Sequence, residues 1–418
     1  MEHVIIIGAG ICGLTAARKL LGAGYKVTIV EARNRIGGRI HTVHDTFSRP
    51  VEVGAEFIHG KQPLTMKLLN EAQGKAVRRE GNHYTLIKGE LHKGDLMDDN
   101  WKSFYRELSQ LTIDTTLDDF LHLHFNSSEF ADLRLSVRRF AEGFDIADTR
   151  KVSVMALREE WANTDEEDQH HILGGYQVLI EYLGKEVHKA GGVIHLSAPV
   201  EAVEWKKGEV VVVTPAKRIQ GDKVLITVPL GVLQHGRISF HPAMPRHQNA
   251  FSDIGFGGVI KFLFEFKERF WESGARQLSN TSFIFSDAEV PTWWTPLPES
   301  TCQITGWLGG PSTLAAGHDT TALFDQAIRS LAYISGNSSA EIRSQLRHWH
   351  IANWVNDPFS LGAYTFPTLE TKSALSFISQ PVDDTIYFAG EAFYEGPSGG
   401  TVEAALSSGG AVAEKIVK

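Results

Sequence analysis

The sequence predicts an α/β protein of two domains, and three observations carry this prediction. A short apolar run, HVIII, leads through glycines into a helical pattern and then into a second apolar run, YKVTIVEA, which together indicate a β-α-β opening. From about Asp98 to Trp161 the pattern is helical, charged and poor in glycine, as in a helical insertion. Helix and strand patterns alternate again after Gly174, and 418 residues suffice for two domains.

The other elements follow from the same periodicities. A helix and a strand are expected between about Leu64 and Glu80, and HYTLIKGELH predicts a hairpin that turns at Lys88-Gly89. GGYQVLIEYLGKEVHKAGGVIHL predicts a helix followed by a strand, whereas VVVVTP, KVLITVPL, GVIKFLFEF and CQITGWLGG each predict a strand. DTIYFAGEAF predicts a strand that breaks at Gly390, and the stretch from Gly399 predicts a final helix.

These elements distribute each domain over separated pieces of the chain. We assign residues 1–78, 190–245 and 375–418 to the domain that the β-α-β unit opens. Residues 79–189 and 246–374 form a second, α+β domain that includes the helical insertion. No linker separates the two, so we expect one compact body with a shared cleft, a common place for a site.

Composition argues against several classes of function. A net charge of −9 disfavours nucleic acid as a partner, and no apolar run approaches the ~20 residues that cross a bilayer. Cys12 and Cys302 form no CxxC pair, and the histidines of HH and HWH lack a third ligand at metal spacing. We therefore expect no metal, no membrane and, because the first strand leaves no room for a secretory signal, a cytoplasmic location.

The first glycine-rich turn predicts a dinucleotide site. In a G-x-G-x-x-G turn, Gly8 would make the bend, Gly10 would let the backbone approach a pyrophosphate, and Gly13 would let helix and strand pack. Glu31 ends the second strand, where a carboxylate meets a ribose hydroxyl. A turn without a ligand is the competing interpretation, and the motif alone does not separate NAD from FAD.

The segment EARNRIGGRIHT narrows the cofactor. It places Arg33, Arg35 and Arg39 around the Gly37-Gly38 doublet, where glycines allow close approach and arginines neutralise phosphate. A basic surface turn would have the same composition. Directly after Glu31, however, the segment resembles the pattern of two-dinucleotide-fold flavoproteins, and more narrowly the flavin-containing amine oxidase family.

Four further segments resemble the same family, in the same order. VEVGAEFIHG resembles its loop beside the flavin ring, and the ending Ile58-His59-Gly60 is most similar to polyamine and spermine oxidases. GFGGVIKFLFEF resembles the strand that carries the family's lysine, here Lys261. WVNDPFSLGAYTFP resembles the segment with an aromatic wall, here Tyr364, and IYFAGEAF with GGTVEAALSSG resembles the C-terminal flavin segment.

The resemblance implies the two-domain fold of FAD-dependent amine oxidases, with a discontinuous Rossmann-like FAD domain and a sheet-plus-helix substrate domain. It also implies non-covalent FAD, because Ala363 stands where some members have the cysteine that attaches the cofactor. The residues expected at the FAD are Gly8, Gly10, Gly13, Glu31, Ala32, Arg33, Gly38, Arg39, Gly54, Ala55, Glu56, Val200, Trp354, Gly390, Glu391, Thr401 and Val402.

The expected catalytic residues are Lys261, Tyr364, His59 and Glu56. By resemblance, Lys261 would place a water near flavin N5, for imine hydrolysis or for the reaction with oxygen. Tyr364 would help an apolar site to favour the neutral amine. Each residue also has a competing interpretation. Tyr364 could be a core tyrosine, and Lys261 could reach solvent, as expected for Lys267. Glu56 and His59 could be purely structural loop residues.

Two departures from the family pattern bear on the substrate. Thr401 occupies the place of the second tyrosine of monoamine oxidases, and Glu56 stands in the loop where amino-acid oxidases carry an arginine. Glu56 would attract a cation and His59 could hydrogen-bond an amine, so Glu56, His59, Tyr364 and Thr401 are the expected substrate contacts.

These residues favour an FAD-dependent oxidase of a primary or secondary amine, with a polyamine as the first choice. Hydride transfer to flavin N5, hydrolysis of the imine and reaction with oxygen would give an aldehyde, an amine and hydrogen peroxide. The alternatives are a monoamine or L-amino-acid oxidase of the same family and a flavin-binding protein without catalysis. The expected partners are a small amine and molecular oxygen, and the oligomeric state stays open.

Overall fold

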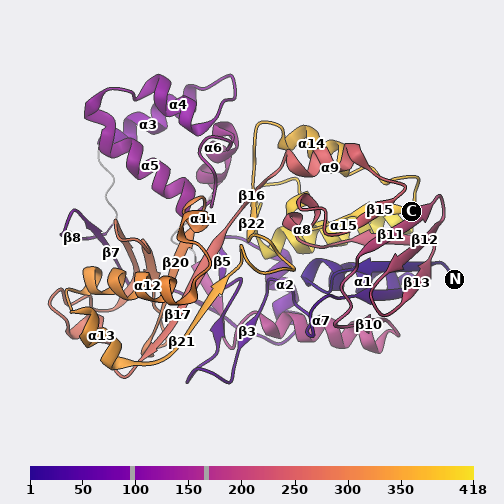
Figure 1. Cartoon of the computed structure of the whole chain (residues 1–418), viewed down its shortest axis with the longest axis horizontal. Helices are drawn as coiled ribbons and strands as arrows, with labels where there is room; N and C mark the ends of the chain where they lie inside the picture. The colour runs from indigo at the N-terminus through magenta and orange to yellow at the C-terminus, as the bar shows by residue number, and fades with distance from the viewer. Residues whose placement is uncertain (95–98, 164–168) are drawn as a thin grey trace.

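A computed structural model of the chain describes residues 1–94, 99–163 and 169–418. Its first unit is built on a five-stranded parallel sheet in the order β10-β2-β1-β14-β23. These strands are β1 (His3–Ile7), β2 (Lys26–Val30), β10 (Val193–His195), β14 (Lys223–Ile226) and β23 (Ile386–Phe388). Because β1, β14 and β23 come from the two ends and the middle of the chain, the unit is discontinuous (Figure 1).

Two further layers cover this sheet. One face packs on α1 (Ile11–Gly22), α7 (Gln177–Lys189) and α15 (Val402–Val417), through a core that includes Leu14, Leu183 and Leu406. The other face packs on a four-stranded sheet of β11 (Ala202–Lys206), β12 (Glu209–Val213), β13 (Arg218–Gly221) and β15 (Ser239–His241). Helices α8 (Leu230–Gln234), α9 (Pro245–Ser252) and α14 (Thr371–Ile378) complete this second core.

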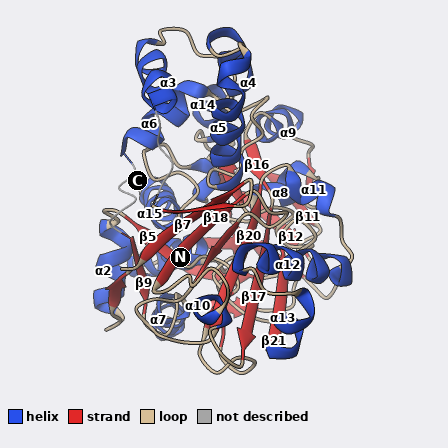
Figure 2. Ribbon diagram, turned by 90° about the vertical axis from the view of Figure 1, so that its left-hand side faces the viewer, coloured by secondary structure: helices blue, strands red, loops and turns tan. Residues whose placement is uncertain are grey.

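The second unit is built on a seven-stranded sheet in the order β21-β17-β20-β19-β18-β7-β8 (Figure 2). Its strands are β7 (Asn82–Ile87), β8 (Glu90–Lys93), β17 (Val259–Phe266), β18 (Thr281–Ser286), β19 (Thr292–Trp294), β20 (Gln303–Gly309) and β21 (Leu346–Asn353). All eight residues of β17 are buried, so this central strand carries Lys261 into the interior. Helices α12 (Thr320–Ser335) and α13 (Ser339–Gln345) contribute to the core on one face, and α10 (Phe270–Ser273) and α11 (Ser312–Ala316) are short.

Small sheets join the two units near the site. They are β3 (Thr42–Val43) with β4 (Val51–Glu52), β16 (Gly255–Gly257) with β22 (Tyr364–Phe366), and β5 (Phe57–His59) with β9 (Gln169–Ile172) and β6 (Ala76–Arg78). Helix α2 (Pro63–Glu71) follows β5, and the short 3-10 helix η2 (Glu391–Phe393) follows β23. Glu403 of α15 binds α2, because its carboxylate accepts from the backbone N–H groups of Leu64 and Thr65 at 2.9 and 2.8 Å.

The helical insertion folds as a cluster of its own above the seven-stranded sheet (Figures 1 and 2). It comprises α3 (Asp99–Gln110), α4 (Leu117–His124), η1 (Ser128–Phe130), α5 (Ala131–Gly143) and α6 (Val154–Asn163). Aromatic rings fill its core, with Phe104 and Phe120 fully buried and 5.7 Å apart. The helices are amphipathic, because their apolar residues form this core and none of the described core residues is charged.

The predicted elements are confirmed in order, from the β-α-β opening to the final helix. Cys12 is buried and its sulfur lies 3.1 Å from where a Cβ on Gly409 would be, so it packs between α1 and α15. The division into domains stays a prediction, but α7 shares a core with α1, which favours a boundary before residue 177 rather than at 190. No helix among the described residues is long and apolar enough to cross a membrane.

Candidate functional site

The glycine turn between β1 and α1 leaves an open cradle. Gly8 has φ +108°, and a Cβ on Gly13 would lie 2.1 Å from the Gly8 carbonyl oxygen, so both positions require glycine. Gly10, the N-cap of α1, has no atom within 4 Å of a Cβ position, and for Gly38 the nearest atom is Gly10 Cα at 3.6 Å. No side chain caps α1, so its first N–H groups are free for a phosphate.

Glu31 lies against this cradle. Its buried carboxylate accepts from the backbone N–H of Ala9 at 2.7 Å and of Arg33 at 2.8 Å. Ala9 stands between the two first glycines, so the carboxylate is held at the edge of the turn. The turn and the acid therefore fit the pyrophosphate and ribose of a dinucleotide such as FAD, and Ala32 continues the same backbone.

The arginines of the second glycine segment join distant parts of the chain. Arg33 pairs with Asp357 through two bonds of 2.9 and 2.6 Å and lies over the ring of Trp354, with Cζ 5.9 Å from the ring centroid. Arg39 donates to the buried carboxylate of Glu391 at 2.8 Å and to the Ala363 carbonyl. Arg35 donates to three backbone carbonyls of its own turn. The guanidinium groups of Arg33 and Arg39 thus hold these C-terminal segments against the second glycine segment.

The loop from Val51 to Gly60 is fixed between the same segments. A Cβ on Gly54 would lie 1.7 Å from the Arg39 carbonyl oxygen and 3.3 Å from the indole of Trp354. The buried Trp354 donates its indole N–H to the Val53 carbonyl at 3.0 Å, and Ala55 donates its N–H to the Arg39 carbonyl at 3.2 Å. The backbone of this loop therefore packs tightly enough that only glycine fits at position 54.

Lys261 and Glu56 form a buried ion pair at the border of the two units. Lys261 is 1% exposed, and its Nζ lies 2.6 Å from Glu56 Oε2 and 3.1 Å from the Gly54 carbonyl oxygen. The other carboxylate oxygen of Glu56 accepts from the indole N–H of Trp294 at 2.9 Å. The Lys261 ammonium also lies over the Trp294 ring, 5.6 Å from its centroid. Both charges are therefore compensated inside the protein.

Tyr364 lies beside Gly400, in the glycine-rich segment that precedes the final helix. Its hydroxyl donates to the Phe144 carbonyl at 2.6 Å, and burial raises the pKa of this hydroxyl well above its usual range. Its ring is stacked near Trp307, with centroids 6.4 Å apart, and lies 3.0 Å from a Cβ position on Gly400. Because its hydroxyl is hydrogen-bonded to the Phe144 carbonyl, Tyr364 can contact a ligand through its ring rather than through its hydroxyl.

Thr401 and Glu391 have structural partners as well. Thr401 is the N-cap of α15, where its hydroxyl oxygen accepts from the Ala404 N–H at 3.2 Å and its O–H donates to the Ser398 carbonyl at 2.7 Å. Val402 begins that helix. Glu391 also accepts from the Thr365 hydroxyl at 3.0 Å, and Gly390 donates its N–H to Ser408 at 3.0 Å.

His59 is a neutral imidazole in an aromatic setting. Its ring lies 5.7 Å from Phe57 and 5.9 Å from Phe144, and its Nδ1 is buried without a hydrogen-bond partner among the described residues. Burial, helped by the positive charge of Arg79, lowers the pKa of His59 to about 4. His59 is therefore uncharged near neutral pH and can exchange a hydrogen bond with a ligand.

The structure brings most of the predicted residues into two adjoining groups. The glycine turn, Glu31, Arg39 and Glu391 form one, and Lys261, Glu56 and Tyr364 lie with the aromatic residues between the two sheets. Val200 differs, because it packs beside the core between the parallel and four-stranded sheets. Sequence reasoning missed Trp294, Trp307 and Arg79, since no motif marks them and only the register of distant strands brings them here.

Fold and site together are those of a dinucleotide-binding protein in which the cofactor site, on a parallel sheet, adjoins a buried lysine of a second sheet. The sequence model for flavin-containing amine oxidoreductases matches residues 11–417. The chain belongs to that family, and its fold is the two-domain α/β fold of FAD-dependent amine oxidases. The resemblance inferred from the sequence is thereby confirmed.

Individual relatives are distant. Polyamine oxidase 4 of Oryza sativa subsp. japonica is 26% identical over 444 residues, 99% of this chain and 88% of that protein. Lysine-specific histone demethylase 2 of Homo sapiens is 26% identical over 423 residues, 94% of this chain, which spans only 50% of the demethylase. The solved structure of wild-type putrescine oxidase bound to putrescine has a TM-score of 0.83 at 20% identity and covers 100% of this chain and 99% of its own.

Proposed function

We propose that this protein binds FAD without a covalent bond and oxidises a primary or secondary amine. When bound, FAD supplies a two-electron acceptor for a hydride from the carbon next to the amine nitrogen, and oxygen takes up these electrons to give hydrogen peroxide. Water would hydrolyse the imine to an aldehyde and either ammonia, from a primary amine, or a smaller amine, from a secondary one. The observation that carries the proposal is the buried Lys261–Glu56 pair, which borders the aromatic residues and adjoins the residues that fit the cofactor.

The aromatic residues would select the uncharged amine. Trp294 and Trp307 have ring centroids 5.9 Å apart, and Trp307 lies 6.4 Å from Tyr364. A protonated amine cannot easily lose hydride, because positive charge would develop beside a charge already present. Apolar walls disfavour the charged form and ring faces can orient the nitrogen, so this wall supports oxidation of the neutral amine.

Lys261 would hold a water rather than act as a base. Glu56 accepts a hydrogen bond from its ammonium at 2.6 Å, so the pair is neutral as a unit and keeps donor groups in place. A water bound to this pair would stand ready to attack the imine. The loop backbone at Gly54 also accepts from Lys261 at 3.1 Å, which fixes the direction of the ammonium.

The choice among amines is a separate proposal. The similarity to polyamine oxidases supports a polyamine, as does the absence of a tyrosine at Thr401. The attraction of Glu56 for a second cation, which also favours a polyamine, is weakened because Glu56 is already paired with Lys261. His59 and Tyr364 remain the proposed substrate contacts.

Anaerobic mixing with a panel of amines tests the proposal. Spermine, spermidine, putrescine and aromatic monoamines are added to the FAD-loaded protein, and the flavin absorbance is followed. At least one amine is expected to bleach it, with peroxide formed when air is admitted. L-amino acids provide the comparison, because bleaching by these alone would favour the alternative activity. Bleaching by none of the compounds would contradict amine oxidation and leave a flavin-binding protein without catalysis.

A further inference from the structure

Polar side chains gather on one face of the small sheet β5-β9-β6. The register pairs His59 with Gln169 and Phe57 with His171, so these side chains lie on the same side of the sheet. Arg79 follows β6, donates its backbone N–H to the Gln169 carbonyl at 2.8 Å and places its guanidinium over the Phe57 ring. We call these five residues the β5-β9-β6 face.

Several buried polar atoms of this face have no partner among the described residues. They are Nδ1 of His59, Nε of Arg79, Oε1 of Gln169 and both ring nitrogens of His171. Buried polar groups in proteins are nearly always hydrogen-bonded, and each one left unpaired costs free energy. Two of these residues, Arg79 and Gln169, also line a pocket, where a polar group of a ligand could reach their side chains.

Arg79 gives this face a positive charge. It is 6% exposed, its Cζ lies 4.9 and 5.0 Å from the ring centroids of Phe57 and Phe283, and it donates to the Thr295 carbonyl at 2.7 Å. None of the carboxylates that the structure describes lies within ion-pair distance of it. Glu56 is near enough to raise the pKa of Arg79, but its charge is committed to Lys261. A buried cation without an anion is costly, and a bound anion would offset that cost.

The remaining members of the face are neutral. Burial and the charge of Arg79 lower the pKa values of His59 and His171, so both imidazoles are uncharged near neutral pH. Burial lowers the pKa of Arg79 itself to about 10, which leaves it protonated. The face therefore offers one positive charge surrounded by imidazole and amide groups.

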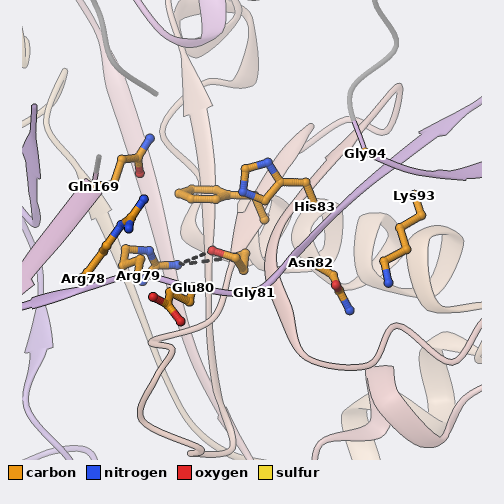
Figure 3. A pocket seen from close by; sticks show the side chains of 11 residues that line it. Arg78, Arg79, Glu80, Gly81, Asn82, His83, Lys93, Gly94 and Gln169 are labelled. Atoms are coloured by element: carbon orange, nitrogen blue, oxygen red, sulfur yellow. Dashed lines mark hydrogen bonds between the residues drawn. The ribbon is translucent and has the colours of Figure 1, made fainter. Parts of the chain in front are cut away.

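A pocket opens beside this face (Figure 3). It has a volume of about 520 Å³, with Arg78, Arg79 and Gln169 on one side and Asn82, His83 and Lys93 on the other. Phe283 lines the pocket and its ring centroid lies 6.1 Å from that of Trp294, the residue that donates to Glu56. One wall is thus continuous from the pocket to the Lys261–Glu56 pair.

We propose that the β5-β9-β6 face and this pocket bind the far end of the amine substrate, and that this end carries a carboxylate. A guanidinium binds a carboxylate through paired hydrogen bonds, and the imidazole and amide groups can satisfy the remaining oxygen lone pairs. A second ammonium would instead meet the positive charges of Arg78, Arg79 and Lys93, against the one carboxylate, that of Glu80, that lines the pocket. The inference rests on the proposed amine oxidation and replaces the polyamine favoured above by an amino carboxylate as the substrate class.

Three substrates that differ only at the far end test this inference. Hexylamine, 1,6-diaminohexane and 6-aminohexanoate are mixed anaerobically with the FAD-loaded protein, and the rate of flavin reduction is fitted against concentration, with shorter and longer homologues for reach. We expect 6-aminohexanoate to have an apparent dissociation constant at least about tenfold below that of the diamine, as for a hydrogen-bonded charge pair. In R79Q the preference for 6-aminohexanoate over hexylamine and the diamine should vanish, and R79K should retain part of it.

A control and a binding measurement keep the outcomes separate. K267Q removes one positive charge from an exposed lysine that does not line the pocket, and it should leave the preference intact. Calorimetric titration with hexanoate, which has no amine, should show binding to the loaded wild-type protein that R79Q loses. A diamine preferred over 6-aminohexanoate, or a carboxylate preference that R79Q keeps, would overturn the inference and leave amine oxidation standing.

The wild-type series alone decides the matter if R79Q does not fold. Equal constants for all three compounds would mean that water, not a carboxylate, satisfies the β5-β9-β6 face, which overturns the inference. Flavin that none of the compounds reduces, nor any polyamine or monoamine, would contradict the proposed function itself.

Discussion

Lys261 and Glu56 lie 205 positions apart in the chain, yet their side chains form an ion pair with a Nζ–Oε2 distance of 2.6 Å. Trp294 completes the unit by donating to Glu56 and by lying beneath the ammonium. Lys261 lies on β17 and Glu56 in the loop from Val51 to Gly60, so the pair ties this loop to the seven-stranded sheet as well as forming part of the proposed site. Its two functions can be separated by substitution.

Glu56→Gln should lower the free energy of unfolding of the protein. The substitution leaves the Lys261 ammonium buried without an anion, and breaking a buried pair in this way costs about 3 kcal/mol in free energy of unfolding. Urea unfolding of the protein without cofactor measures the loss. The double variant Glu56→Gln with Lys261→Met should recover much of it, and equal stability of the single variant and wild type would contradict the ion pair.

Lys261→Met should slow turnover while FAD stays bound. Lysine and methionine have similar length, and Lys261 makes its hydrogen bonds to Glu56 and Gly54. We expect a decrease of about tenfold or more in one half-reaction, flavin reduction or reoxidation, since misplacing a reacting group such as the water that Lys261 would hold can cost this much. Lys267→Met is the matched control, because Lys267 is exposed and its Nζ, among the described residues, donates only to the Ser344 carbonyl. Unchanged rates in both half-reactions would remove the assigned role.

Trp294→Phe should keep the aromatic wall and lose the hydrogen bond to Glu56. The freed carboxylate oxygen would be partly buried and unpaired, which should cost about 1–3 kcal/mol in stability. Flavin reduction at a range of pH values should show an altered profile, because Glu56 would then hold Lys261 less firmly. Trp293→Phe is the control, since the neighbouring indole donates to the Val290 carbonyl and has no contact with the pair. Identical profiles for both variants would contradict the positioning role of Trp294.

FAD should leave the protein when it unfolds. Ala363 lies beside the cradle, where its carbonyl accepts from Arg39, and it offers no thiol for attachment. Acid precipitation is therefore expected to leave the flavin colour in the supernatant. Glu391→Gln should reduce the FAD content of the purified protein, because it removes the carboxylate that fixes Arg39. Colour retained in the washed precipitate would contradict non-covalent binding.

The parts of the site that local motifs encode were predictable from the sequence. Glycine positions and Glu31 follow from the conformational demands of a turn that a few residues define. The resemblance of its strand to that of the family identified Lys261, whereas the sequence assigned Glu56 to a substrate cation and the structure pairs it with Lys261. Trp294 and Arg79 escaped prediction because their roles depend on the register of β19 and β6 against strands far away in the chain.

His59 should make the stability of the protein depend on pH. Its folded pKa, about 4, lies below the ordinary histidine value of 6.5, so between these values only the unfolded chain binds the proton. The contribution is complete above pH 6.5 and is lost as the pH falls towards 4, with a total of about 3 kcal/mol. His59→Gln, which keeps hydrogen-bonding groups but does not titrate, should flatten the curve in this range. Urea unfolding at pH 4.5, 5.5, 6.5 and 7.5 measures the difference between the two proteins, in which the titration of other groups cancels. Parallel curves would mean that His59 is protonated in the folded state, and the neutral imidazole proposed for the substrate face would then be wrong.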